Sequence, residues 1–286
     1  MDDDPAPQQH TTRIDLGERF RAGYNNTMLI VVSPAKALDY SSKLPTRKHS
    51  QPRMLDQAEP LVDVMRQKTP DEIARLMSIS AELAELNFER YADWEAPFTT
   101  ADARPALLAF TGDVYQGMDA AATFTERDYT HAQKVLRILS GLYGVLRPLD
   151  LMQPYRLEMG SKLATDRGRD LYAYWGERIT ETLNADLAAS PGPAVVVNLA
   201  SHEYFRSVDA SRLEGRLVTP AFLDARGESE PRMISFFAKR ARGSMAGWII
   251  RNRVKSVRGL RDFDGLGYGF DLERSDTDRP VYVRYS

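Results

Sequence analysis

Several polar side chains that could perform acid–base chemistry follow segments that we expect to be buried strands. Lys36 and Asp39, for example, come after the apolar run Met28 to Val32. In α/β proteins, polar residues just past the ends of strands build pockets. The full set of such candidates is Lys36, Asp39, Asp113, Tyr115, Arg156, Glu158, Asn198, Ser201, Glu203 and Tyr204. These residue types therefore predict a polar pocket.

Such a pocket could hold a nucleobase or a nucleotide. Lys36 would then bind a phosphate, and Asp113 or Glu158 would act as the general acid or base. A network of buried salt bridges that only holds the loops together accounts for the same residues, and the sequence slightly favours it. Because no nucleophile and base stand at a diagnostic spacing, a binding protein is favoured over an enzyme.

A second group of residues suits the binding of a polyanion. The net charge of −2 hides two stretches without any Asp or Glu, from Pro231 to Leu260 and from Tyr129 to Leu149. Cations that no acid neutralises create a local positive potential, whatever the total charge. The cations of the two stretches are His131, Lys134, Arg137, Arg147, Arg232, Lys239, Arg240, Arg242, Arg251, Arg253, Lys255 and Arg258.

The longer stretch predicts a basic helix from about residue 238 to residue 254. At about 100° per residue, Lys239, Arg242 and Arg253 share one stripe of this helix. Arg240 and Arg251 form a second stripe. Two cationic stripes suit contacts with DNA phosphates, although Lys and Arg stems that merely cover apolar surface would give the same pattern.

A glycine turn between Gly141 and Gly144 follows a segment that we expect to be a helix, residues 125–139. Glycines in a tight turn between helices let backbone N–H groups approach a phosphate. Arg137 and Arg147 flank the turn and would hold neighbouring phosphates, which fixes a protein on the duplex without reading its sequence. An ordinary glycine cap at the end of a helix is the alternative.

The remaining pattern predicts one α/β mixed (α+β) domain over residues 28–286, with a mixed β-sheet flanked by helices. We expect residues 1–27 to lie outside this domain, as an extension that is either disordered or absent from the native protein. The expected strands are residues 28–32, 106–110, 155–159, 194–200, 217–224, 233–237 and 281–285. One helix is expected to begin at the Thr69 capping box. Further helices are expected over residues 80–94, 125–139, 168–189 and 238–254.

Composition excludes several classes of function. The chain has no cysteine, so disulfides, thiolate metal sites and thiol-based peroxide chemistry are excluded. Its four histidines stand apart, so we expect no metal and no cofactor. We find no apolar run long enough for a membrane span and no secretory signal, and we expect a cytoplasmic monomer.

Five motifs carry a resemblance to a known family. They are Ser33–Tyr40, Gly112–Tyr115, Leu139–Gly160, Asn198–Phe205 and Ile234–Gly243. From Met28 to its C-terminus the chain resembles the YaaA family, with Thr111 in place of a lysine and His202 in place of an acid. The resemblance implies binding of double-stranded DNA, a positively charged cleft, a helix-hairpin-helix-like element and a role in limiting peroxide damage by keeping free iron low.

Overall fold

A five-stranded mixed sheet forms the centre of the molecule in the computed structural model, which describes residues 28–190 and 194–285. Its strand order is β6-β5-β1-β8-β9, and only β6 runs antiparallel to its neighbour. The strands are β1 (Leu29–Val32), β5 (Leu136–Ser140), β6 (Gly144–Leu146), β8 (Val195–Asn198) and β9 (Arg216–Val218). The expected mixed α/β fold is therefore confirmed.

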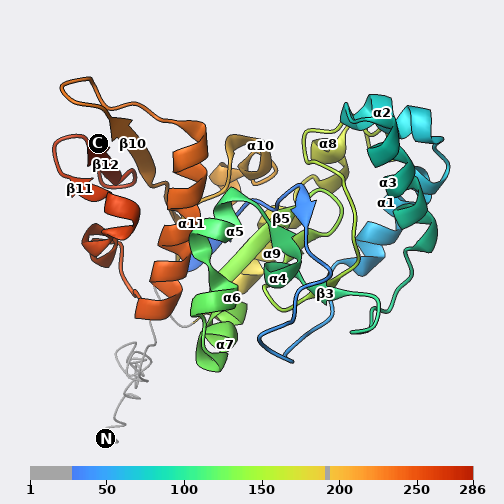
Figure 1. Ribbon diagram of the computed structural model, residues 1–286, viewed down its shortest axis with the longest axis horizontal. Helices are drawn as coiled ribbons and strands as arrows, with labels where there is room; N and C mark the ends of the chain where they lie inside the picture. The colour runs from blue at the N-terminus through green and yellow to red at the C-terminus, as the bar shows by residue number, and fades with distance from the viewer. Residues whose placement is uncertain (1–27, 191–193, 286) are drawn as a thin grey trace, which may run out of the picture.

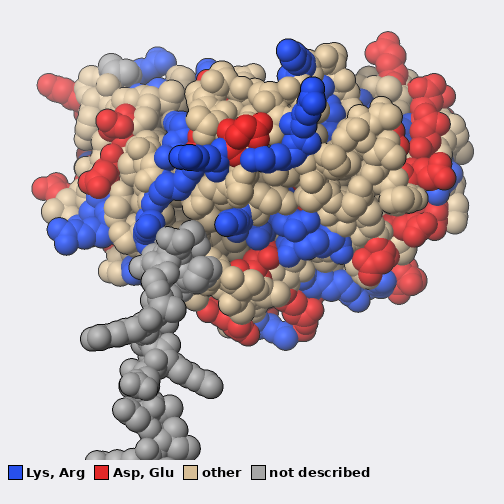
Figure 2. Space-filling model, turned by 90° about the horizontal axis from the view of Figure 1, so that it is seen from below, with Lys and Arg blue, Asp and Glu red and all other residues tan. Residues whose placement is uncertain are grey.

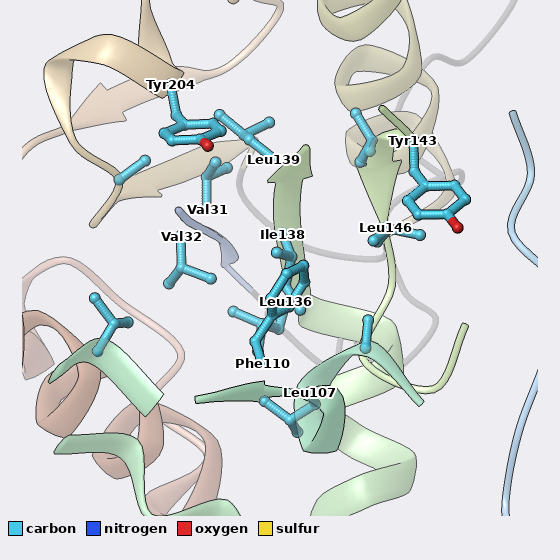
Figure 3. Close-up of a cluster of buried hydrophobic side chains, with 14 of the residues drawn as sticks. Val31, Val32, Leu107, Phe110, Leu136, Ile138, Leu139, Tyr143, Leu146 and Tyr204 are labelled. Atoms are coloured by element: carbon cyan, nitrogen blue, oxygen red, sulfur yellow. The ribbon is translucent and has the colours of Figure 1, made fainter. Parts of the chain in front are cut away.

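Burial explains the sequences of the central strands. Every residue of β1 and of β8 is buried, as expected where helices cover both faces of a parallel sheet. Such strands are continuous apolar runs, and this is why residues 28–32 and 194–200 were correctly predicted as strands. Figure 3 shows Val31 and Val32 of β1 beside Ile138 of β5, with Phe110 closing the core from below.

Smaller sheets and the helices surround this sheet (Figure 1). A three-stranded sheet, β10-β12-β11, combines β10 (Ala221–Ala225), β11 (Gly269–Asp271) and β12 (Val281–Tyr285). Two-stranded sheets pair β2 (Ala37–Leu38) with β4 (Phe110–Thr111), and β3 (Arg104–Pro105) with β7 (Leu151–Met152). The longest helix of the described ranges, α11 (Ser235–Asn252), packs against β10, α5 and α7.

Among the other helices, α9 and α10 contact β6 and β5 of the central sheet, whereas α3 packs against α1 and α2 at one side of the molecule (Figure 1). In chain order they are α1 (Leu55–Arg66), α2 (Pro70–Met77), α3 (Ala81–Asp93), α4 (Ala106–Ala109), α5 (Asp113–Met118), α6 (Ala120–Thr123), α7 (Glu126–Val135), α8 (Leu171–Trp175), α9 (Arg178–Ala189) and α10 (His202–Phe205). The predicted capping box at Thr69 is present, since its hydroxyl accepts from Glu72 N and the Glu72 side chain accepts from Thr69 N. The helix expected over residues 80–94 is α3.

Several predicted elements are wrong, and each error has a local cause. Residues 106–110 form one helical turn and then β4, because a short apolar run does not distinguish helix from strand. The helix expected over residues 168–189 is divided into α8 and α9 by Gly176, whose φ of 51° ends α8. Pro220 lacks an N–H and separates β9 from β10 within the expected strand 217–224.

Two further predicted strands are also absent. Residues 155–159 have no strand partner, and their backbone instead lies against Gly141. Residues 233–237 run into the helix, which begins at Ser235 rather than near residue 238. The expected extension, residues 1–27, lies outside the described residues. No helix of the described part is long and apolar enough to cross a membrane.

Candidate nucleic-acid interface and polar cluster

The segment from Arg137 to Arg147 is not a pair of helices. Helix α7 ends at Val135, and residues 136–140 continue as β5, which pairs with β1. The sheet overrides the helical pattern here because all five residues of β5 are buried between neighbouring strands and helices. The turn joins the antiparallel strands β5 and β6, so the predicted helix-hairpin-helix-like element at this position is wrong.

Close packing accounts for both glycines of this turn. A Cβ on Gly141 would lie 2.3 Å from Leu157 O. At Gly144 the φ is +65°, and a Cβ would lie 2.8 Å from the Trp175 ring. The turn is buried, and Tyr143 N already donates to Ser140 Oγ at 2.9 Å. The close packing of Gly141 and Gly144 in this buried turn therefore does not support a role for either glycine in phosphate binding.

The two arginines beside the turn make ion pairs within the protein. Arg137 is 4% exposed and its Nε lies 2.6 Å from Asp186 Oδ2. Asp186 also pairs with Arg53 at 2.7 Å. Burial raises the pKa of Asp186, but hydrogen bonds from Arg53 and Arg137 outweigh burial and lower the pKa to about 2.

Arg147 also forms an ion pair within the protein. Its Nη2 lies 2.8 Å from Oδ1 of Asp150, a carboxylate that is completely buried. The same Nη2 donates to Gln51 O at 3.1 Å. The placement of Arg137 and Arg147 therefore indicates structural ion pairs and does not support phosphate binding by either residue.

The N-terminal half of α11 presents cations of a different kind. Lys239 is exposed and Arg242 is half-buried, and within the described ranges neither has a hydrogen bond or an ion pair. Burial lowers the pKa of the Arg242 guanidinium, and no carboxylate compensates. Arg240 stacks over Phe236 with its Nε buried and without a hydrogen-bond partner. Unlike Arg137 and Arg147, Lys239, Arg240 and Arg242 therefore form no ion pair with a carboxylate of the described residues.

The C-terminal end of α11 is partly neutralised. Arg253 caps the helix and pairs with Asp128 of α7 at 2.7 Å. Arg251 donates to Thr123 Oγ1 at 3.0 Å and remains exposed. Arg253 follows Arg242 by eleven positions and Lys239 by fourteen, so it lies about 16 to 21 Å from them along the helix. The stripe is therefore divided between the two ends of α11.

The two acid-free stretches of the sequence meet at this end of α11. Burial, together with the nearby cations Arg253, Lys134 and Lys255, lowers the pKa of His131 on α7 to about 4, although Asp128 acts to raise it. We call His131, Lys134, Arg251, Arg253 and Lys255 the α7–α11 face. Seen from below, as in Figure 2, Lys and Arg side chains gather over the middle of the molecule, while Asp and Glu gather at the right-hand border.

Several of the predicted pocket residues lie at the carboxyl ends of β1 and β8, which are neighbouring parallel strands. Ser33 Oγ accepts from Ser201 N at 2.8 Å, which ties the end of β1 to the end of β8. Tyr115 OH donates to Ser33 O at 3.0 Å. Segments more than 160 residues apart in the chain are thus brought together at one edge of the sheet.

Lys36, Arg156 and Glu158 form the charged part of this cluster. Glu158 Oε1 lies 3.1 Å from Lys36 Nζ and 3.2 Å from Arg156 Nε. The Lys36 side chain is 68% exposed, whereas those of Arg156 and Glu158 are mostly buried. Three of the predicted pocket residues therefore do converge, with Lys36 at the solvent side.

Three other predicted pocket residues, Asn198, Glu203 and Asp39, have structural roles. Asn198 Oδ1 accepts from Ala200 N at 3.0 Å, and Glu203 Oε1 accepts from Gly160 N at 3.0 Å. Asp113 begins α5, where the preceding Gly112 packs against Ala35, and it makes no side-chain hydrogen bond to the described residues. Asp39 Oδ1 accepts from Ser41 N and Ser42 N and stabilises its own loop.

Buried tyrosines line the same edge. Burial raises the pKa values of Tyr115, Tyr155 and Tyr204, so these phenols stay protonated at neutral pH and can donate hydrogen bonds. Tyr155 OH lies 2.6 Å from Ser140 Oγ at the end of β5. Figure 3 shows the Tyr204 ring beside Leu139 at the end of β5. The described residues contain no group of His, Asp and Glu side chains that could hold a metal ion.

Sequence reasoning missed Arg90 and Arg104. Arg104 is 8% exposed, and its Nε is buried without a hydrogen-bond partner. Arg90 is half-buried and pairs with no acid of the described residues. The local signal for Arg104 is its position two residues before the apolar run 106–110, and that position carries no information about burial.

Comparison with known proteins identifies the family of this chain. The sequence profile of the family described as "Peroxide stress protein YaaA" matches residues 28–274. The chain therefore belongs to this family, whose name places it in the response to peroxide stress. It is also similar to a UPF0246 protein of Aromatoleum aromaticum, with 53% identity over 260 residues that cover 90% of this chain and 99% of the relative.

Proposed function

We propose that the protein binds double-stranded DNA without sequence preference, through phosphate contacts made by the α7–α11 face and by the cations at the opposite end of α11. The observation that carries this proposal is the meeting of the two acid-free stretches on one surface. Lys134 from the first stretch and Lys255 from the second both act on His131. A positive potential shared by two segments suits a polyanion.

The charge of this surface remains positive after the ion pairs are counted. Beside α7, Lys48 donates to Glu126 O and pairs with the Glu126 carboxylate, and a pocket of about 480 Å³ there is lined by Arg47 and Lys48 among others. Six cations (Arg47, Lys48, Lys134, Arg251, Arg253 and Lys255) stand against the two acids Glu126 and Asp128. The surplus of four charges is of the size expected for several phosphate contacts.

The unpaired cations Lys239, Arg240 and Arg242 extend this surface along α11. They lie about 16 to 21 Å from Arg253 at the C-terminal end of the helix, a distance that roughly five or six base pairs span, since successive phosphates on one strand are about 3.4 Å apart. A duplex lying along α11 would contact both ends. Covering DNA in this way would shield it from oxidants, which fits the peroxide-stress role of the family.

The decisive test removes two cations from the α7–α11 face. The double variant Lys134→Ala with Lys255→Ala should bind a random duplex more weakly, and its slope of log affinity against log salt should fall by about two. A control with the same change in net charge, Arg75→Ala with Arg169→Ala, replaces two exposed arginines elsewhere and should leave the slope unchanged. Equal slopes for both double variants would refute this interface.

A second candidate function is an enzyme that acts on a nucleobase or nucleotide at the polar cluster. The convergence of Lys36, Arg156 and Glu158 favours it. In that case Glu158→Gln would abolish turnover of a nucleotide substrate and leave duplex affinity unchanged. Screening nucleosides and nucleotides for turnover by the parent protein tests this candidate independently of the DNA interface.

A further inference from the structure

A buried arginine without a hydrogen bond stands beside the polar cluster. Arg104 lies in β3, and in the described part of the chain none of its nitrogens donates a hydrogen bond. Its nearest carboxylate oxygen is Asp39 Oδ1, at 3.9 Å, which is too far for a hydrogen bond. That oxygen already accepts from Ser41 N at 2.8 Å and Ser42 N at 3.0 Å.

This arrangement is costly unless something else satisfies the guanidinium. An arginine has five N–H donors, and the buried Nε–H of Arg104 loses its hydration without gaining a hydrogen bond. Buried polar groups in folded proteins almost always have a partner, so each exception calls for an explanation. An oxyanion that accepts two parallel hydrogen bonds from Arg104 would supply that partner.

A second arginine, Arg90, acts on the Tyr40 phenol together with Arg104. Arg90 is half-buried and lacks a carboxylate among the described residues, and burial lowers its pKa. Burial raises the pKa of Tyr40, whereas Arg90 and Arg104 both act to lower it, so the two guanidiniums lie near one phenol. Tyr40 OH donates to Met152 O at 2.6 Å, which holds the ring in place.

The Lys36–Glu158–Arg156 group adjoins these arginines. Tyr91 links the two groups, since it follows Arg90 in α3 and its hydroxyl donates to Arg156 O at 2.8 Å. Together the two groups contain four cations (Lys36, Arg90, Arg104 and Arg156) and two acids (Asp39 and Glu158), which leaves a surplus of two positive charges. A phosphate monoester, with a charge of about −1.5 to −2 at neutral pH, matches that surplus.

We propose that this site binds the phosphate group of a small phosphate monoester, with Arg104 and Arg90 as its direct ligands and Lys36 at its solvent side. The site differs from the α7–α11 face and shares no residue with it. In this proposal Arg104 binds the phosphate and does not stabilise the fold, so its removal is expected to leave the unliganded protein folded. This separates the assignment from a purely structural role, in which loss of Arg104 would destabilise the protein.

Calorimetric titration with adenosine 5′-monophosphate and with inorganic phosphate tests the proposal. The parent protein should bind both probes, and citrate, a tricarboxylate that is more highly charged than phosphate at neutral pH, should nevertheless bind at least tenfold more weakly. Arg104→Met should weaken binding of both phosphate probes at least tenfold while the melting temperature without ligand stays equal to or above that of the parent. Arg75→Met, at an exposed arginine of α2, is the matched control and should bind like the parent.

Three results would overturn the assignment. The first is the absence of phosphate binding at millimolar concentration. The second is phosphate binding that Arg104→Met leaves unchanged. The third is a melting temperature that Arg104→Met lowers by several degrees, which would show that Arg104 stabilises the unliganded protein. A carboxylate that binds more tightly than phosphate would contradict the choice of ligand class.

Discussion

The turn between β5 and β6 and the helix α11 present the same sequence pattern but opposite structural outcomes. Both belong to stretches that contain cations and no acids. At the turn, Arg137 and Arg147 are held by Asp186 and Asp150. On α11, Lys239 and Arg242 have no acid partner within the described part of the chain.

The difference shows that a local run of cations does not reveal whether they are neutralised. Asp186 pairs with Arg137 from 49 positions further along the chain, and it reaches the arginine only because α9 packs beside the central sheet. Burial of the arginine is the second distinguishing property. Arg137 is buried because β5 pairs with β1. This pairing could not be predicted, since residues 125–139 have the periodicity of a helix.

The largest expected effect concerns the ion pair at the turn. Asp186→Ala would leave Arg137 and Arg53 partly buried without a carboxylate, and should cost about 3–5 kcal/mol of unfolding free energy. Urea denaturation measures this loss. Asp166→Ala, at an exposed position, is the control and should change stability by less than about 0.5 kcal/mol. A loss below about 1 kcal/mol for Asp186→Ala would mean that the pair is not structural.

The next effect concerns the glycines of the turn. Gly141→Ala places a methyl group 2.3 Å from Leu157 O, so the backbone must move, at a cost of about 1–3 kcal/mol or more. Gly269→Ala meets no atom within 4 Å and should be tolerated. Thermal denaturation of the two variants provides the comparison. If both variants melt alike, the explanation of Gly141 by close packing is wrong.

The fold could be predicted from the sequence better than the site. Continuous apolar runs such as Val195–Val197 identify buried strands, and the capping box at Thr69 identifies a helix start, because both depend on local residues. The hairpin of β5 and β6 could not be predicted, since strand pairing is a long-range property.

The same limit applies to the sites. Lys36 and Glu158 were predicted as polar candidates from their positions near strand ends, whereas Arg104 carries no local pattern. What singles out Arg104 is burial without a hydrogen-bond partner, and that property exists only in the folded protein.

A third prediction tests the α11 side of the comparison. Lys239→Ala with Arg242→Ala should weaken duplex binding about tenfold and lower the salt slope by about two, because each lost contact removes about one counterion from the release. Fluorescence anisotropy with a labelled duplex measures both quantities. Stability should change by less than about 0.5 kcal/mol at the exposed Lys239, and Lys239→Ala alone controls for any packing role of the Arg242 stem. Unchanged affinity would confine the interface to the α7–α11 face.

The smallest effect concerns pH. Burial and the cations of the α7–α11 face lower the pKa of His131 to about 4, below its value of about 6.5 in the unfolded chain. The unfolded state therefore takes up a proton first as the pH falls, and stability decreases from about pH 6.5 towards pH 4. After solvent screening the contribution is on the order of 1 kcal/mol. His131→Asn should remove this part of the pH dependence, and an unchanged profile would contradict the positive potential inferred for this face.

The most direct test of the central claim is the salt dependence of duplex binding by the parent protein. With at least four or five phosphate contacts, log affinity should fall with log salt at a slope of about −4 or steeper. Two duplexes of unrelated sequence should bind with similar affinity at each salt concentration. A flat salt response, or a strong preference for one sequence, would contradict an interface built from the unneutralised cations of α7 and α11.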